Sequence, residues 1–288
     1  MQSAAVPAVP SRVRAYLDAI IDTCAGNGRT LTTMILFGSA AIGGWEESVS
    51  DVDLILVLPD GATTDDRNRL CREVERIELL HGLRHDRPDR PRLLQRLVDK
   101  LTANVRSFFI CTRSDLLSGD IGRILGVHPS QGRFIDRIVL ANIAGSGITA
   151  WGEELLPLIP VAPIRRFDVL KSFFGLFCQA MLYLEVFSLL PGATKYSMGT
   201  LKRSVHSCFF CYQLRRAPLE EEVRFLQRRL RPSRALTELL ALRRDYRSSF
   251  AFVLRCLPAL IRLHLRTAID NRFPRSTRGV DAPQSDMM

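Results

Sequence analysis

Two aspartates that flank a single residue open an apolar run and have the types and spacing to bind a metal ion. Asp51 and Asp53 stand at the start of a segment, residues 51–58, that is expected to form a strand. Side chains two positions apart in a strand point to the same face, so both carboxylates would project together while Val52 and Leu54 enter the core. Carboxylates this close repel each other, which raises the pKa of one of them. A hard divalent cation removes the repulsion, and Mg²⁺ prefers carboxylate and phosphate oxygens.

A glycine and a serine follow the preceding predicted strand, at a point suited to binding phosphate. Residues 31–37 are expected to form a strand that ends at Gly38 and Ser39, and residues 40–45 to form a short helical turn. Glycine lets the backbone approach phosphate oxygens closely. The amide and hydroxyl of Ser39, with the first amides of the helical turn, would donate hydrogen bonds to phosphate. If the two strands are neighbours, this bend and the aspartates meet at one edge of the sheet.

The bend and the aspartates together resemble a known family. Phe37-Gly38-Ser39, followed 13 positions after Gly38 by Asp51-Val52-Asp53-Leu54, is similar to the nucleotidyltransferase superfamily typified by DNA polymerase β, which includes the aminoglycoside nucleotidyltransferases. The resemblance covers residues 31–115 and extends loosely to residues 151–156, where a tryptophan-glycine turn is similar to that of the antibiotic-modifying members.

The resemblance implies an activity and roles for these residues. Gly38 and Ser39 would hold the triphosphate of a nucleoside triphosphate, while Asp51 and Asp53 would bind Mg²⁺ and act in catalysis. An acceptor hydroxyl would attack the α-phosphate, so that a nucleoside monophosphate is transferred and pyrophosphate leaves. The tryptophan-glycine turn suggests a small hydroxylated acceptor, whereas the basic composition suggests RNA.

A third acid, which members of this superfamily often carry on the third strand, is not evident here. Residues 105–111 are expected to form that strand and contain no aspartate or glutamate. Asp115 follows it, and Glu153 or Glu154 would reach in from the later turn, so Glu153 is the candidate for the third catalytic residue. The alternative is a degenerate nucleotidyltransferase-like module that binds nucleotide or RNA as a regulator.

Lysine is rare in this chain, which makes two lysines of the C-terminal half candidates for phosphate binding. Only four lysines occur, and Lys195 and Lys202 lie seven positions apart, on one face of a predicted helix. Lys195 and the adjacent Tyr196 are therefore candidates for nucleotide binding. A solvated helix face is the alternative interpretation.

The pattern of elements predicts an α+β protein, with a nucleotidyltransferase-type mixed sheet and helices followed by an all-helical domain. We expect a catalytic domain over residues 1–158, a helical domain that closes over substrate or nucleotide over 159–270, and a disordered tail over 271–288. The predicted helices of the first domain cover 11–26, 64–80, 93–101 and 135–144, with a short strand or turn at 147–151. Prolines separate the later predicted helices, which cover 165–190, 196–215, 218–230 and 233–269.

Composition narrows the class of protein. Forty Lys and Arg residues against 30 Asp and Glu give a net charge of +10, which favours anionic partners. Seven cysteines, an odd number in apolar surroundings, indicate reduced thiols in a cytoplasmic protein. His206 with Cys208 and Cys211 lacks the further ligands of a structural zinc site.

Residues 172–190 approach the length of a membrane span, but Gln179 and Glu185 interrupt them, so we expect a helix of a soluble domain and no membrane partner. The oligomeric state stays open.

Overall fold

The computed structural model describes residues 9–26, 31–46, 50–83, 107–127, 137–185, 192–230 and 233–270. The helix predicted over 93–101 and the tail predicted over 271–288 lie outside these residues. The N-terminal half contains four strands, β1 (Thr33–Phe37), β2 (Asp53–Leu58), β3 (Phe108–Thr112) and β4 (Ile148–Gly152). Its helices are α1 (Ser11–Gly26), α2 (Thr64–Leu80), α4 (Arg113–Leu117), α5 (Ile121–Ile124) and α7 (Arg137–Ser146), with a 3-10 turn at Leu156–Leu158.

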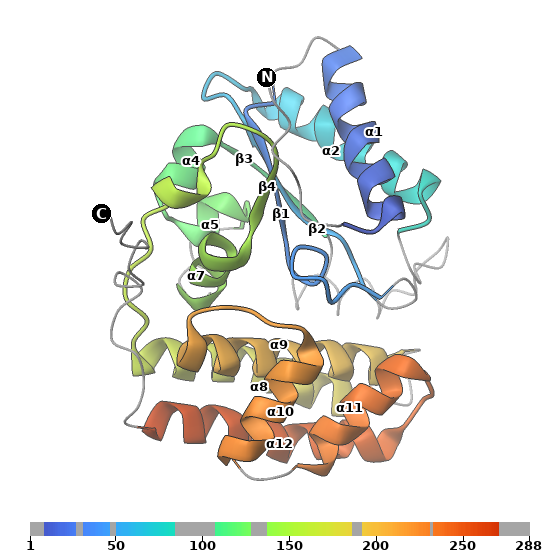
Figure 1. The fold of residues 1–288 in the computed structure, drawn as a ribbon, viewed down its shortest axis with the longest axis vertical. Coiled ribbons are helices and arrows are strands. Elements are labelled where there is room, and N and C mark those ends of the chain that lie inside the picture. The colour runs from blue at the N-terminus through green and yellow to red at the C-terminus, as the bar shows by residue number, and fades with distance from the viewer. Residues whose placement is uncertain are drawn as a thin grey trace, which may run out of the picture.

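The four strands form one mixed sheet in the order β3-β2-β1-β4, which confirms the predicted α+β class. β1 runs antiparallel to both β2 and β4, while β2 and β3 are parallel. Alternate strand residues face two separate cores: α1 and α2 cover one face, and α4, α5 and α7 cover the other (Figure 1). Because β1 and β2 are neighbours in an antiparallel pair, the end of β1 and the start of β2 meet at one edge of the sheet.

The α2 helix begins where the sequence predicts it because two reciprocal hydrogen bonds cap its N-terminus. The hydroxyl of Thr63 accepts a hydrogen bond from the backbone amide of Asp66, and the Asp66 carboxylate accepts one from the amide of Thr63. This reciprocal capping box satisfies two amides that a helix N-terminus otherwise leaves without partners. It fixes the chain that leaves β2 after the turn at Pro59-Asp60-Gly61.

The C-terminal half is helical, as predicted. It consists of α8 (Arg166–Glu185), α9 (Ala193–Gln213), α10 (Leu219–Leu230), α11 (Arg234–Arg244) and α12 (Phe250–Ile269). The predicted single helix over 233–269 is wrong, because α11 ends at Arg244 and α12 begins after Ser249, whose hydroxyl caps the amide of Phe252. Residues 245–249 between the two helices contain one aromatic side chain, Tyr246, which is exposed, so the segment adds no side chain to the core.

The two halves pack through a shared apolar cluster. Ile138 and Ala141 of α7 contact Phe210 and Cys211 of α9, and Figure 1 shows the helical half lying below the edge of the sheet where β1 ends. Among the described helices, α8 is long and apolar enough to meet the length and composition test for a membrane span, a test that core helices also meet. It packs against α9 and α12, and its Gln179 accepts a hydrogen bond of 2.6 Å from the guanidinium of Arg203.

Candidate active site

The end of β1 and the start of β2 bring Gly38 against Asp53. Phe37 pairs with Asp53 across the antiparallel strands, so the next residue, Gly38, begins the bend directly beside the carboxylate. Gly38 has φ +72°, and a Cβ atom at this position would stand 2.1 Å from Oδ2 of Asp53. Only glycine combines this left-handed backbone with so close an approach. The expected meeting of bend and aspartates at one sheet edge is therefore confirmed.

Asp51 and Asp53 keep the alternation expected of a strand, although the strand itself begins only at Asp53. Val52 is buried between them at 2% exposure, while Asp51 is exposed and Asp53 is partly exposed. The strand starts late because β1 turns away after Phe37 and leaves Asp51 without a pairing partner. Both carboxylates are thus accessible at the edge of the sheet, on the side of the bend.

Burial raises the pKa of Asp53 from 3.8 to about 7, and the negative charge of Asp51 adds to the rise. The cations Lys202, Arg216 and Arg203 act in the opposite direction. A carboxylate pair that holds a proton near neutral pH has the electrostatics of a cation site, because a bound cation would take the place of that proton. Among the residues that the structure describes, no three His, Cys, Asp or Glu side chains gather as a metal cluster. Two carboxylates suit Mg²⁺, which usually takes one or two from the protein and completes its shell with water and substrate phosphates.

The expected helical turn after Ser39 does not form. Residues 38–43 are a series of turns, closed by a hydrogen bond of 3.0 Å from the amide of Gly44 to the carbonyl of Ser39. Gly43 adopts a second left-handed conformation with φ +74°, which prevents a helix from continuing. Donors for phosphate at this bend are therefore turn amides and the Ser39 hydroxyl, without a helix dipole behind them.

The helical half presents Lys202 to the two aspartates. Burial and the nearby Arg243 lower the pKa of Lys202, while Asp53 and Asp51 act to raise it. The interpretation of this helix face as solvated is therefore wrong at Lys202, which is half-buried and faces the carboxylates. Lys195 lies two turns away along the same helix, roughly 10 Å. Tyr196 stacks on Tyr183 of α8 with ring centroids 5.3 Å apart. The nucleotide-binding role of Lys195 and Tyr196 stays a prediction.

Three arginines that sequence analysis missed also lie at this interface. Arg203 follows Lys202 on α9, Arg216 lies between α9 and α10, and Arg243 lies on α11. Arg243 is 3.5 Å from both the Glu46 carboxylate and the Ser50 hydroxyl, so it ties α11 to the segment before Asp51. Arginine is common throughout the chain, so no residue type or spacing marks these three.

The structure does not bring Glu153 to the aspartates, so the expected third catalytic position is wrong. Gly152 of β4 pairs with Thr33 at the start of β1, whereas Asp53 pairs with Phe37 at its end. Four strand steps separate these positions, roughly 13 Å. Glu153 is exposed and forms a salt bridge of 2.9 Å with Arg113.

The third strand offers no acid either. Parallel pairing of Leu54 with Phe108 sets Ser107 beside Asp53, and the Ser107 hydroxyl donates to the carboxylate of Glu78. Asp115 caps the first turn of α4 and accepts a hydrogen bond from Arg67 at 3.0 Å. The described residues therefore provide a two-carboxylate site, with its cations supplied by the helical half.

Comparison with known proteins agrees with this geometry. The family model described as "Nucleotidyltransferase domain" matches residues 18–86, which include the bend at Gly38 and both aspartates. Residues 18–86 are thus similar to a nucleotidyltransferase domain. The matched segment runs from α1 through α2 and stops before β3, so the helical half lies outside it. No curated protein matches the chain.

The whole fold is similar to that of a solved nucleotidyltransferase. The crystal structure of spectinomycin adenyltransferase AAD(9) from Enterococcus faecialis, determined with ATP and spectinomycin, aligns with a TM-score of 0.50 and 10% sequence identity. The alignment covers 88% of this chain and 99% of that chain, so it includes both the N-terminal half and the helical half. At this identity the similarity is one of fold.

Proposed function

We propose that this protein transfers a nucleoside monophosphate from a nucleoside triphosphate to an acceptor hydroxyl with Mg²⁺, and releases pyrophosphate. One observation carries the proposal: Asp51 and Asp53, beside the Gly38 bend, face Lys202 and Arg216 across the interface between the two halves. Carboxylates on one side suit a metal ion, and cations on the other suit phosphates. A metal-bound triphosphate has complementary charges for both sides.

In this reaction the protein would position the metal ion and the triphosphate and would neutralise the charge of the phosphates. Asp51 and Asp53 would hold Mg²⁺, which would supply positive charge at the oxygens of the reacting phosphate. Gly38 and Ser39 would receive the triphosphate at the bend, and Lys202 would bind its outer phosphates. The acceptor oxygen forms a bond to the α-phosphorus and its proton passes to water, while the bond from that phosphorus to the bridging oxygen breaks. The electron pair leaves with pyrophosphate, whose charge the cations of α9 and the following loop stabilise.

We propose a small hydroxylated acceptor ahead of RNA. Support comes from the adenyltransferase of similar fold, which was crystallised with ATP and spectinomycin. The alignment covers 99% of that protein. RNA remains the second acceptor to test because the net charge of +10 favours anionic partners. We also propose a cytoplasmic location, because none of the seven cysteines forms a disulfide.

The second candidate function is a regulator that binds nucleotide or RNA and transfers nothing. A specific feature favours it: the residue beside Asp53, directly before β3, is Ser107, and its hydroxyl is hydrogen-bonded to Glu78. A site without a third carboxylate has lost one group that would accept the acceptor proton. Nucleotide binding without turnover would distinguish this candidate from the enzyme.

The test measures binding and turnover on the same preparations. Isothermal titration with each Mg²⁺–nucleoside triphosphate, beginning with ATP, gives the binding constant, and a pyrophosphate-release assay follows turnover with hydroxylated antibiotics, nucleosides and RNA oligomers. We expect Asp53→Asn to abolish pyrophosphate release. Asp18→Asn, a matched change on the exposed face of α1, should leave it unchanged. Release at the same rate from Asp53→Asn and from the wild-type protein would refute the proposed site.

A further inference from the structure

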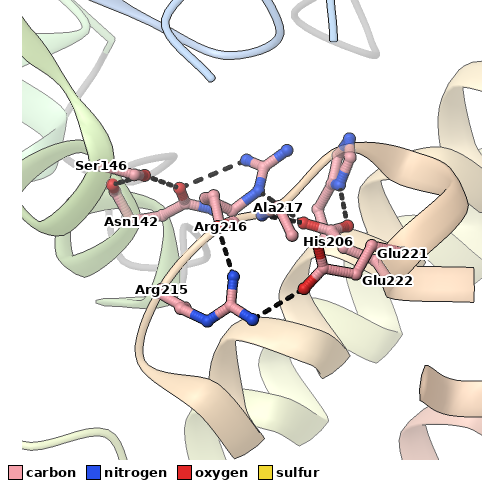
Figure 2. Close-up of polar contacts among 8 residues, drawn as sticks. All are labelled: Asn142, Ser146, His206, Arg215, Arg216, Ala217, Glu221 and Glu222. Carbon is pink, nitrogen blue, oxygen red and sulfur yellow. Dashed lines mark hydrogen bonds and ion pairs between the residues drawn. The ribbon is translucent and has the colours of Figure 1, made fainter. Parts of the chain in front are cut away.

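A fully buried glutamate organises the loop between α9 and α10. Glu222, in the first turn of α10, has 0% exposure. Its Oε1 accepts hydrogen bonds from Nε of Arg216 at 3.0 Å and from the amide of Ala217 at 3.2 Å. Its Oε2 is hydrogen-bonded to Nδ1 of His206 on α9 (Figure 2). A buried carboxylate is costly unless each oxygen has partners, and here both oxygens are satisfied.

The backbone before α10 separates two adjacent arginines. Leu214 ends α9 in the left-handed conformation with φ 51°, a strained state for a leucine, and its amide donates to the carbonyl of Phe210 at 2.8 Å. After this turn Arg215 points outward and pairs with Glu221 at 2.7 Å on the exposed face of α10. Arg216 points inward and is only 7% exposed (Figure 2).

Arg216 also reaches the nucleotidyltransferase domain. Its Nη1 donates to the side-chain oxygen of Asn142 on α7 at 3.2 Å, and that oxygen also accepts from the hydroxyl of Ser146 at 2.9 Å. With Nε on Glu222 and Nη1 on Asn142, the guanidinium is held from both halves of the molecule. Its Nη2 has no hydrogen-bond partner among the residues that the structure describes. The positive charge of Arg216 acts to lower the pKa of Asp53, so the guanidinium lies within electrostatic reach of the candidate active site.

The protonation states favour this arrangement. Burial and the charge of Arg216 lower the pKa of His206, so its ring is neutral and donates its Nδ1 hydrogen to Glu222. Burial alone would raise the pKa of Glu222, but His206 and Arg216 bring it below its ordinary value. Glu222 is therefore ionised, and Arg216 is the cation that balances it.

We infer that Glu222 is a positioning residue, which fixes the Arg216 guanidinium on the side of the interface near Asp53 so that its free Nη2 receives a phosphate oxygen of the nucleotide. The inference rests on the proposed function and names a residue outside the matched family segment. A guanidinium already held in its binding orientation loses little side-chain freedom when the phosphate arrives. Glu222 itself would touch neither nucleotide nor metal.

A positioning role and a purely electrostatic role predict opposite effects of neutralising Glu222. If Glu222 only placed a negative charge near the site, Glu222→Gln would make the site more positive and MgATP would bind more tightly. If Glu222 positions Arg216, the neutral amide loses the charge-assisted hydrogen bond and the guanidinium moves, so that MgATP binds less tightly. A structural role alone would lower the melting temperature without changing the binding constant.

The experiment measures MgATP binding to the full-length chain by isothermal titration. We expect Arg216→Ala to weaken binding about 10- to 100-fold, as loss of a charge-assisted phosphate contact does. Glu222→Gln should weaken it about 5- to 20-fold, and the double variant should bind no more weakly than Arg216→Ala, because coupled residues are not additive. Glu221→Gln is the matched control on the same helix, with a half-exposed side chain paired with Arg215, and should bind within about twofold of wild type.

Each outcome decides the inference. Binding by Glu222→Gln as tight as wild type or tighter, or additive losses in the double variant, would overturn it while the proposed function stands. Absence of nucleotide binding by the wild-type protein would overturn both. If Glu222→Gln is unfolded at the assay temperature, Asn142→Ala removes the other anchor of Arg216 at a half-buried site. That variant should bind MgATP more weakly than wild type, and unchanged binding would overturn the inference.

Discussion

Replacing Gly38 with alanine tests whether the bend must be glycine for Asp53 to occupy its place. A non-glycine residue in the left-handed region costs about 1–2 kcal/mol, partly offset by the lower entropy of the unfolded chain. The new Cβ would also stand 2.1 Å from Oδ2 and 3.0 Å from Cγ of Asp53, so that side chain must rotate away. Forcing a side chain off its rotamer costs about 0.5–1.5 kcal/mol more.

Gly43 provides the matched control for the same substitution. It has φ +74°, close to the +72° of Gly38, but a Cβ there would meet no atom within 4 Å. Gly43→Ala should therefore lower the free energy of unfolding by about 1 kcal/mol, and Gly38→Ala by about 2 kcal/mol, in urea denaturation. Because displacement of Asp53 disturbs the proposed metal site, Gly38→Ala should also weaken MgATP binding about tenfold or more.

The comparison of the two glycines isolates the contact with Asp53 from the backbone effect. If both alanine variants unfold at the same urea concentration and bind MgATP equally, the approach of Gly38 to Asp53 does not govern the site. Equal loss of stability with unequal binding would locate the effect in the position of the carboxylate alone. Because the two positions have the same backbone strain, its cost cancels when the two variants are compared.

Three further substitutions test separate parts of the structure. The folded protein binds a proton at Asp53 between pH 3.8 and about 7 that the unfolded chain has lost, so the free energy of unfolding falls as the pH rises through this window. The full rise in pKa corresponds to about 4 kcal/mol. Because Asp53 is partly exposed and solvent screens its charge, we expect Asp53→Asn in EDTA at pH 8 to be about 2 kcal/mol more stable than wild type, with no difference at pH 3. Urea titrations that show no pH dependence would contradict the raised pKa. Glu153→Gln should leave MgATP binding unchanged in the same calorimetric assay, whereas a weakened variant would return Glu153 to the site. Thr63→Ala removes the cap of α2 and should lower the free energy of unfolding by about 1 kcal/mol without affecting nucleotide binding, as thermal denaturation with and without MgATP would show.

Local sequence signals were sufficient for the N-terminal half of the site. Gly38 and the aspartates lie within 16 positions of one another, and alternation of Val52 and Leu54 with the aspartates fixes which side chains enter the core. These features depend on strand geometry and on the conformational freedom of glycine, which act over a few residues. They are therefore readable without knowledge of the tertiary structure.

The cationic side of the site could not be predicted in the same way. Lys202 and Arg216 lie about 150 positions or more from Asp53 and reach it only because α7 packs against α9. The different directions of Arg215 and Arg216 depend on the positive φ of Leu214. Leucine rarely adopts a positive φ, and no sequence pattern predicts it here. Glu153 was misplaced for a related reason: its distance from the aspartates depends on the antiparallel register of β4 with β1.

The contact that Ser107 makes directly before β3 explains why no acid stands beside Asp53 at this position. The hydroxyl of Ser107 donates to Glu78, a carboxylate with 6% exposure on α2, so the side chain is committed to the α2 side of the sheet. An aspartate there would face Glu78 instead of Asp53, and two buried carboxylates without a shared cation repel.

We therefore expect Ser107→Asp to lower the free energy of unfolding by about 1–3 kcal/mol at neutral pH, through the lost hydrogen bond and the new repulsion. Adding Glu78→Gln should recover part of that loss, since the amide can donate to the new carboxylate. Urea denaturation of the single and double variants measures both effects. If Ser107→Asp instead accelerates pyrophosphate release, the side chain at this position faces Asp53 and not Glu78. That result would contradict a site built from two carboxylates and the cations of the helical half.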